Sequence, residues 1–144
     1  MKIPGYLKEK RATLTAAAES GDLNEFLRLA AMAAKGALFF FGAPEETIDI
    51  GTGCDNEDYA IQVLCVTGPT PPTSLFLTSM QAYAWRFYLE EGKVCIENEE
   101  CEPVSVEEFL CELGGAMYKM AGAAIFCADP ALKTGEQLDS EPPS

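Results

Sequence analysis

The side chains in this sequence that could bind or transform a ligand are mainly carboxylates, and they concentrate in one segment. Residues 90–112 contain nine glutamates against a single basic residue, Lys93. Glu107 and Glu108 are expected at the N-terminus of a helix, where negative charge is favourable. The other glutamates form either a solvated rim or an acidic surface that faces a protein partner. Such a partner surface would consist of Glu97, Glu99, Glu100 and Glu102.

A cluster of aromatic side chains precedes this acidic segment. Tyr83, Trp85 and Phe87 recur at every second position. In a chain of 144 residues a cluster of this kind usually fills the hydrophobic core. Alternatively, it lines a groove that receives a peptide or a small molecule. The sequence leaves both interpretations open.

No residue pattern in the chain predicts catalysis. Histidine is absent, so the commonest general base and the usual Ser–His and Cys–His triads are missing. Cys54 and Cys101 have acidic neighbours, which disfavour a nucleophilic thiolate. Gly51-Thr52-Gly53 lacks the Gly-Lys-Thr/Ser sequence of a phosphate-binding loop and predicts a turn. We therefore predict no catalytic residue and do not expect an enzyme.

Metal and cofactor sites are not predicted either. The six cysteines never form a Cys-x-x-Cys pair, which disfavours structural zinc, and we expect free thiols in a reducing compartment. The segment 55–58 offers oxygen ligands for a divalent cation but lacks EF-hand spacing. This segment and the aromatic cluster support an alternative function, a small-molecule or divalent-metal-binding module.

The net charge of the chain limits its partners. Acids outnumber bases 23 to 10, which gives a formal charge of −13. This charge argues against nucleic acid, which is bound through Lys and Arg, and against an anionic membrane surface. We find neither an export signal nor the roughly 18 consecutive apolar residues of a membrane span, so we expect a cytoplasmic protein. The oligomeric state is not indicated.

The first half of the chain predicts two helices followed by strands. Residues 6–19 are typical of a helix that ends at Ser20-Gly21. A capping box from Asp22 to Glu25 begins the next helix, which we expect to end near Gly36. Strands are then predicted at residues 37–41, 47–50, 59–66 and 75–77, with a polar loop at 51–57 and a proline-rich loop at 67–74.

Residues 79–91 fit two structures. The alternation of aromatic residues indicates a strand that leads into a hairpin at 90–93, whereas the spacing of Met80, Tyr83 and Phe87 fits a helix. We favour the helix, because Thr78 and Gln81 can form a capping box and Gly92 stands where a helix C-cap glycine would.

The last third of the chain predicts a strand, a helix and a final strand. The strand is expected at residues 94–97, followed by an acidic loop, and a capping box at Ser105–Glu108 begins the helix. Gly114-Gly115 should end this helix by Tyr118, because two adjacent glycines cost about 2 kcal/mol relative to alanine. Residues 121–128 could extend the helix, but we favour a last strand.

These elements predict an α+β fold, a small mixed or mostly antiparallel sheet with N-terminal helices and two further helices packed on it. Residues 1–128 should form a single globular domain. Residues 129–144 are rich in Pro, Ser and acidic residues and are expected to be a disordered tail.

Four short motifs in this order resemble a known bacterial family. They are Gly36–Phe41, the strand-to-helix junction Leu75–Ser79, the capped segment Val104–Leu110 and the late segment Ala121–Pro130. Together they resemble the N-terminal domain of the SseB (enhanced serine sensitivity) family. The junction has one inserted residue relative to the family's Phe-Thr-Ser, and Asp129-Pro130 replaces Asn-Pro.

The resemblance implies a mixed α/β domain without established catalytic residues. Taken with the absence of histidine and the acidic segment, it predicts a non-enzymatic bacterial interaction or regulatory domain of SseB-like type. Such a domain would act by binding a protein partner through its acidic surface.

Overall fold

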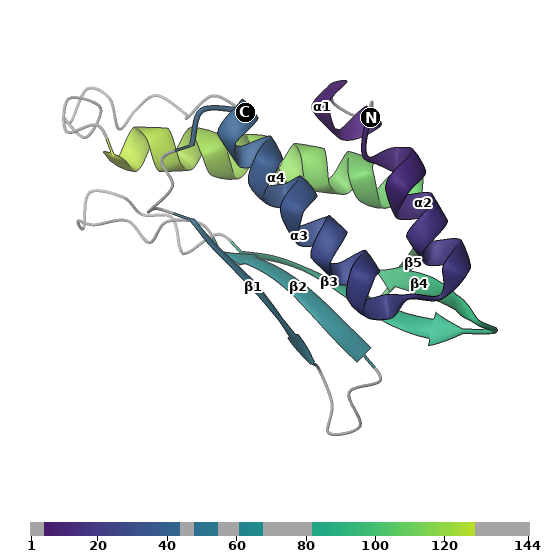
Figure 1. Cartoon of the computed structure of the whole chain (residues 1–144). Coiled ribbons are helices and arrows are strands. Elements are labelled where there is room, and N and C mark those ends of the chain that lie inside the picture. Colours follow the sequence, from purple (N-terminus) through teal and green to yellow (C-terminus); the bar gives the residue numbers. More distant parts are fainter. Residues whose placement is uncertain (1–4, 44–47, 55–60, 68–81, 129–144) are drawn as a thin grey trace.

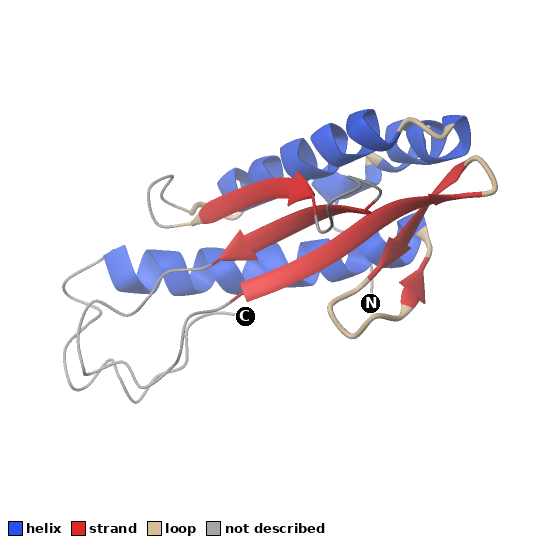
Figure 2. Ribbon diagram, turned by 90° about the horizontal axis from the view of Figure 1, so that it is seen from below, coloured by secondary structure: helices blue, strands red, loops and turns tan. Residues whose placement is uncertain are grey.

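The computed structural model describes residues 5–43, 48–54, 61–67 and 82–128 (Figure 1). A helical layer covers one face of a five-stranded sheet in this part of the chain, and the other face is uncovered (Figure 2). In chain order the elements are α1 (Gly5–Lys8), α2 (Arg11–Ser20), α3 (Leu23–Phe40), β1 (Asp49–Cys54), β2 (Ile61–Thr67), β3 (Ala82–Glu90), β4 (Lys93–Glu97), β5 (Pro103–Val104) and α4 (Val106–Ala128).

The sheet has the strand order β1-β2-β3-β4-β5, and each strand runs antiparallel to the next. This arrangement confirms the predicted α+β class. β2 lies inside the sheet, as the apolar residues on both of its faces predicted. The prediction of two further helices is wrong in number: within the described residues only α4 follows the sheet.

The N-terminal helices are joined by a tight turn at Gly21. Gly21 has a φ of 74°, a left-handed conformation that glycine adopts without strain. A Cβ atom there would collide with the carbonyl oxygen of Gly92 in the β3–β4 hairpin. Glu19 and Lys93 form an ion pair of 3.1 Å beside this contact. The predicted helix end at Ser20-Gly21 is therefore confirmed, and it is where the helical layer rests on the hairpin.

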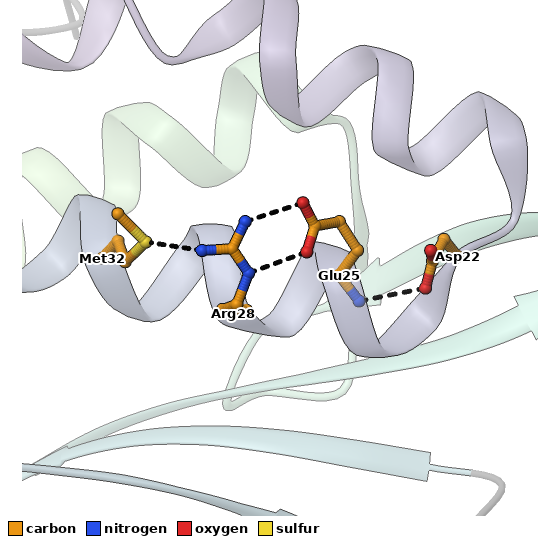
Figure 3. A network of polar contacts seen from close by, with 4 residues as sticks. All are labelled: Asp22, Glu25, Arg28 and Met32. Atoms are coloured by element: carbon orange, nitrogen blue, oxygen red, sulfur yellow. Dashed lines mark hydrogen bonds and ion pairs between the residues drawn. The ribbon is translucent and has the colours of Figure 1, made fainter.

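The start of α3 is held by a chain of polar contacts along its exposed side (Figure 3). The backbone amide of Glu25 donates to Asp22 Oδ1 at 3.1 Å, as the predicted capping box requires. The Glu25 carboxylate does not close the box; it accepts two 2.7 Å hydrogen bonds from Arg28. These bonds lower the pKa of Glu25. Arg28 also contacts the Met32 sulfur at 3.1 Å.

The prediction that this helix ends near Gly36 and that residues 37–41 form a strand is wrong. α3 continues through Gly36 to Phe40. Its buried residues keep one helical face along the whole length, ending in Ala37 and Leu38. Burial of that face outweighs the roughly 1 kcal/mol cost of one glycine in a helix.

Residues 51–54 are also strand, not the turn and polar loop that their glycines suggested. β1 pairs with β2 along its whole length, from Asp49 opposite Thr67 to Cys54 opposite Gln62. Neither Gly51 nor Gly53 has a positive φ, and a Cβ atom at Gly53 would meet nothing within 4 Å, so the backbone does not require glycine here. Strand pairing has overridden local propensity here.

Residues 82–90 form the strand β3, so the helix favoured for 79–91 is wrong. β3 pairs with β2 on one side and with β4 on the other. Its side chains alternate between the helical layer and the open face, which matches the alternation of aromatic residues. Glu91 and Gly92 both have positive φ, 53° and 77°. These values form the type I′ turn that suits a two-residue hairpin, so Gly92 serves this turn and not a helix cap.

The prediction that Gly114-Gly115 ends the last helix, and that 121–128 is a strand, is wrong as well. α4 runs from Val106 to Ala128. Its predicted start is confirmed, since the Glu108 amide donates to Ser105 Oγ at 3.0 Å and the Ser105 amide donates to Glu108 Oε1 at 3.2 Å. The helix continues past the glycines because its buried apolar face continues on both sides of them. The buried side chains of this face include Phe109, Leu110, Leu113, Met117, Met120 and Ala121.

Aromatic rings join the two layers at the centre of the core. Phe26 of α3 packs edge-on against Phe87 of β3, with ring centroids 5.2 Å apart. Phe109 of α4 packs against Phe87 and Trp85, at 5.5 Å in each case. These rings tie α3, α4 and the sheet into one core.

Several sequence predictions lie outside the described residues. They are the segment 55–58, the loop at 67–74 beyond Thr67, the strand at 75–77 and the tail at 129–144. The predicted domain boundary at residue 128 stays a prediction.

Candidate functional site

A pocket of about 210 Å³ lies where β3, the turn at 98–102 and α4 meet. Tyr83 and Trp85 line it from the sheet, Glu99 and Glu100 from the turn, and Glu112 from the helix. It therefore combines the two groups of residues, aromatic and acidic, that the sequence identified separately.

Trp85 is positioned by the core and by one hydrogen bond. Its ring is buried, with 3% of its surface exposed, and packs edge-on against Phe109 at 87°. The indole Nε1 donates to Glu112 Oε1 at 3.1 Å, which gives the buried N–H its partner. Tyr83 lies nearly parallel to the indole, with centroids 6.4 Å apart. The aromatic wall of the pocket is thus rigid at Trp85 and more open at Tyr83.

Asn98 organises the acidic turn. Its side-chain oxygen accepts hydrogen bonds from the backbone amides of Glu100 and Glu102, both at 3.0 Å. Its side-chain nitrogen lies 3.3 Å from Glu112 Oε2 and 3.4 Å from Glu102 Oε1. Cys101, with a φ of 63°, completes the turn. The asparagine therefore holds the turn together and links it to Glu112 of α4.

The electrostatic field at this turn is negative. The pKa of Glu100 is raised, first by a hydrogen bond to the Glu102 carboxyl and then by the charge of Glu102. Burial and, to a lesser degree, the charge of Glu99 raise the pKa of the Tyr83 hydroxyl. Both shifts show that further negative charge is unfavourable here. One cation, Lys119, also lines the pocket.

The structure divides the predicted surface residues among several roles. Glu99 and Glu100 line the pocket with Tyr83 and Trp85, and Glu102 contacts Asn98 in the turn. Glu97 lies on β4, opposite Arg86, and does not line the pocket. Phe87 is fully buried in the core, so the interpretation of this residue as a groove aromatic is wrong.

Two residues at the pocket escaped the sequence analysis. Glu112 was counted among the acids of 90–112, but not assigned to the surface, and Asn98 was not considered. The sequence position of each of these two residues could have indicated its role. Glu112 follows the buried Phe109 by three helical positions, and a core tryptophan needs an acceptor. Asn98 directly follows a strand, where asparagine often organises a turn.

Among the residues that the structure describes, no group of three or more Cys, Asp or Glu side chains is arranged to hold a metal ion. Cys54, Cys65, Cys95 and Cys101 are free thiols. The pKa of Cys95 is raised by burial and by the charges of Glu90 and Glu91, which disfavours its thiolate. No helix within the described ranges is long and apolar enough to cross a membrane.

Comparison of the chain with protein-family models, with curated proteins and with solved structures finds no match. The resemblance to the SseB N-terminal domain therefore stays a prediction.

The chemistry of the pocket suits a positively charged group. Carboxylates at its rim form charge-assisted hydrogen bonds with ammonium or guanidinium groups. An aromatic wall attracts the same groups through its ring face. Carboxylates and aromatic rings therefore meet in one pocket that can bind such a group.

Proposed function

We propose that this chain is a non-enzymatic interaction or regulatory domain of the bacterial cytoplasm that binds a protein partner through its acidic surface. In this proposal a Lys or Arg side chain of the partner enters the pocket formed by Trp85, Glu99, Glu100 and Glu112. The SseB-like resemblance is consistent with such a role, and no reaction is required of the chain.

The observation that supports the proposal best is the joining of an aromatic wall with carboxylates from two separate elements. Trp85 and Glu112 are fixed by their mutual hydrogen bond, so little ordering is needed when a ligand binds. The pKa of Glu100 is raised by a hydrogen bond to the Glu102 carboxyl and then by the negative charge of Glu102, which repels that of Glu100 in the unbound chain. A cation placed between them relieves that repulsion, which favours binding.

The size of the pocket favours a side chain over a whole small molecule. Its volume of about 210 Å³ lies below the range of roughly 300–1,000 Å³ that is usual for small-molecule sites. Glu107 and Glu108 lie beyond it at the start of α4, where Glu107 pairs with Arg11 at 3.4 Å. Glu97 lies on the open face of the sheet, opposite Arg86 on β3. A protein partner with several basic residues could contact the pocket and the start of α4.

The alternative function is the binding of a small organic cation in the same pocket. Its support is the presence of two neighbouring aromatic rings, Tyr83 and Trp85, beside the carboxylates, since aromatic ring faces attract quaternary ammonium groups. A thermal-shift series with tetramethylammonium and choline tests it. A raised melting temperature with either ion would favour this alternative over a protein partner.

The test of the main proposal is affinity capture from bacterial lysate with matched charge variants. The double variant Glu99→Gln/Glu100→Gln removes two charges at the pocket. The control Glu90→Gln/Glu91→Gln removes two exposed charges at the β3–β4 hairpin. We expect a partner that the wild type and the control retain and the pocket variant loses.

Capture should also weaken when salt is raised from about 0.05 M to about 0.5 M, because exposed charges are then screened. Partners that all three proteins retain equally at both salt concentrations would contradict the proposal, as would the recovery of no partner by the wild type.

A further inference from the structure

The two edges of the sheet differ in a way that matters for binding. β5 has only two residues, and one of them is Pro103, which has no amide hydrogen to donate. β1 has six residues and contains neither proline nor a basic residue. Among the described residues no strand pairs with its outer side, and Figure 2 shows it as the outermost long strand. Proteins usually protect such edges with Pro, Lys or short strands, and β1 has none of these protections.

A groove of about 440 Å³, lined by apolar side chains together with Lys35, Asp49 and Thr52, runs beside this open edge, between α3 and β1. Met32 and Phe39 line it from α3, and Ile48, Ile50 and Thr52 line it from the β1 side. Met32 is 51% exposed and Phe39 48% exposed. These are large apolar side chains to leave in water within a monomer.

A free strand edge beside a groove that a helix closes is the geometry of strand addition. A peptide in extended conformation pairs its backbone with the edge, and every second side chain enters the groove. Ile50 and Thr52 lie on the same face of β1, so the floor of the groove already has this two-residue spacing.

The charges favour a basic partner over a second copy of the chain. The groove itself is nearly neutral, because Lys35 and Asp49 are its charged lining residues. The whole chain has a formal charge of −13, so two copies brought together at this edge would repel each other. A basic segment would be attracted by the same field.

We propose that an extended, basic segment of a partner protein adds to β1 as a sixth strand and places alternate apolar side chains in the groove between α3 and β1. This site is separate from the acidic pocket and does not depend on it. It recognises the partner's main chain and its alternating apolar side chains, whereas the pocket binds a single charged side chain.

The probe is a dye-labelled peptide of about eight residues, a common strand length, in which Val and Lys alternate. Two further peptides are N-methylated, one at every Val and the other at every Lys. Along an edge strand only one of these two sets of amides faces β1. One methylated peptide should therefore bind at least about tenfold more weakly than the parent, and the other should bind like it.

Matched variants locate the site on the protein. Thr52→Lys places a charge at the edge and should weaken the parent peptide by at least about tenfold, whereas Thr52→Val should keep binding within about twofold. Phe39→Ala should weaken it, whereas Phe40→Ala should not, because Phe40 is 63% exposed but does not line the groove. Binding should also shift the amide NMR signals of residues 49–54.

Three results would overturn the proposal. Both methylated peptides could bind as the parent does, which would mean that only charge is recognised. Binding could be lost in Glu99→Gln/Glu100→Gln and kept in Thr52→Lys, which would place the peptide at the acidic pocket and leave the proposed function intact. The parent peptide could also fail to bind at all.

Discussion

The acidic pocket and the groove beside β1 lie on different flanks of one helical layer. Different kinds of chemical group form them. The pocket uses side chains that are already held in place: Trp85 is bonded to Glu112, and Asn98 bonds the acidic turn. The groove uses exposed apolar side chains and a backbone edge. A pocket of the first kind selects charge and weakens with salt. A groove of the second kind selects an extended backbone and should be less sensitive to salt.

The difference follows from where each region lies relative to the aromatic core. Phe109 packs against both Trp85 and Phe87, so the pocket is supported by the buried core of the molecule. The groove lies at the C-terminal half of α3 and at an edge strand, where Phe39 and Met32 are half exposed. A core defect should therefore affect the pocket first.

The largest expected effect is that of Phe109→Ala. Removing a fully buried ring that contacts Trp85, Phe87 and Phe26 should lower the free energy of unfolding by about 3–5 kcal/mol. The matched control, Phe40→Ala, removes an exposed ring and should change it by less than about 1 kcal/mol. Urea unfolding measures both. Equal effects would contradict the central place of Phe109 in the core.

The next effect is that of Gly21→Ala at the contact between the helical layer and the hairpin. The left-handed conformation costs about 1–2 kcal/mol for a residue with a Cβ atom, and the Cβ would also collide with the Gly92 carbonyl. A loss of about 2 kcal/mol or more is expected in thermal or urea unfolding. Gly53→Ala in β1 has open space and should be neutral or slightly stabilising. Similar losses at the two glycines would be inconsistent with this structure.

A smaller effect is expected at the start of the helix that carries Glu112. Ser105→Ala removes the Oγ that accepts from the Glu108 amide and should cost about 1 kcal/mol. Ser105→Thr should restore most of the loss, because threonine also caps helices. Binding of a basic peptide at the pocket should weaken in the alanine variant, whereas binding at the groove should be unchanged. A weakening at both sites would mean that the cap acts on the whole fold.

The smallest effect is the pH dependence of Glu100→Gln. The pKa of Glu100 is raised above its ordinary value of 4.5, so its ionisation is less favourable in the folded chain than in the unfolded one. Any stability linked to its protonated form is present below pH 4.5 and is lost as pH rises through the folded-state pKa. The glutamine variant should therefore melt slightly higher than wild type at pH 7, with no difference well below pH 4.5. A lower melting temperature of the glutamine variant than of the wild type at pH 7 would contradict the unfavourable interaction between Glu100 and Glu102.

The capping boxes predicted the starts of α3 and α4 correctly, whereas the ends expected at glycines within these two helices were wrong. The capping boxes at Asp22 and Ser105 involve residues only three positions apart, and both starts are confirmed. The ends at Gly36 and Gly114 were misjudged because the glycine penalty is local, while the burial that overrides it comes from strands far away in the sequence. Residues 82–90 were misjudged because Gly92 fits a helix end and a type I′ turn equally well before the strand pairing is known.

The sequence predicted the two groups of site residues separately, but not that they meet. Both the acids and the aromatic residues were identified, but nothing in the sequence placed Trp85 beside Glu112, which lies 27 residues away. That contact depends on residues 82–90 being a strand paired with β2 and β4, whereas a helix was favoured there from the sequence. The open edge of β1 was not predicted, because strand order decides which strand lies at an edge.

The most direct test of the central proposal uses the fact that Trp85 is the only tryptophan in the chain. Its fluorescence reports on the pocket without any label. We expect it to change as the blocked peptide Gly-Arg-Gly is added, and we expect no change with the same peptide carrying the neutral isostere citrulline. The response should be lost in Glu99→Gln/Glu100→Gln and kept in Glu90→Gln/Glu91→Gln. An equal response to both peptides, or no response to arginine, would contradict the account of the pocket as a site for a basic side chain.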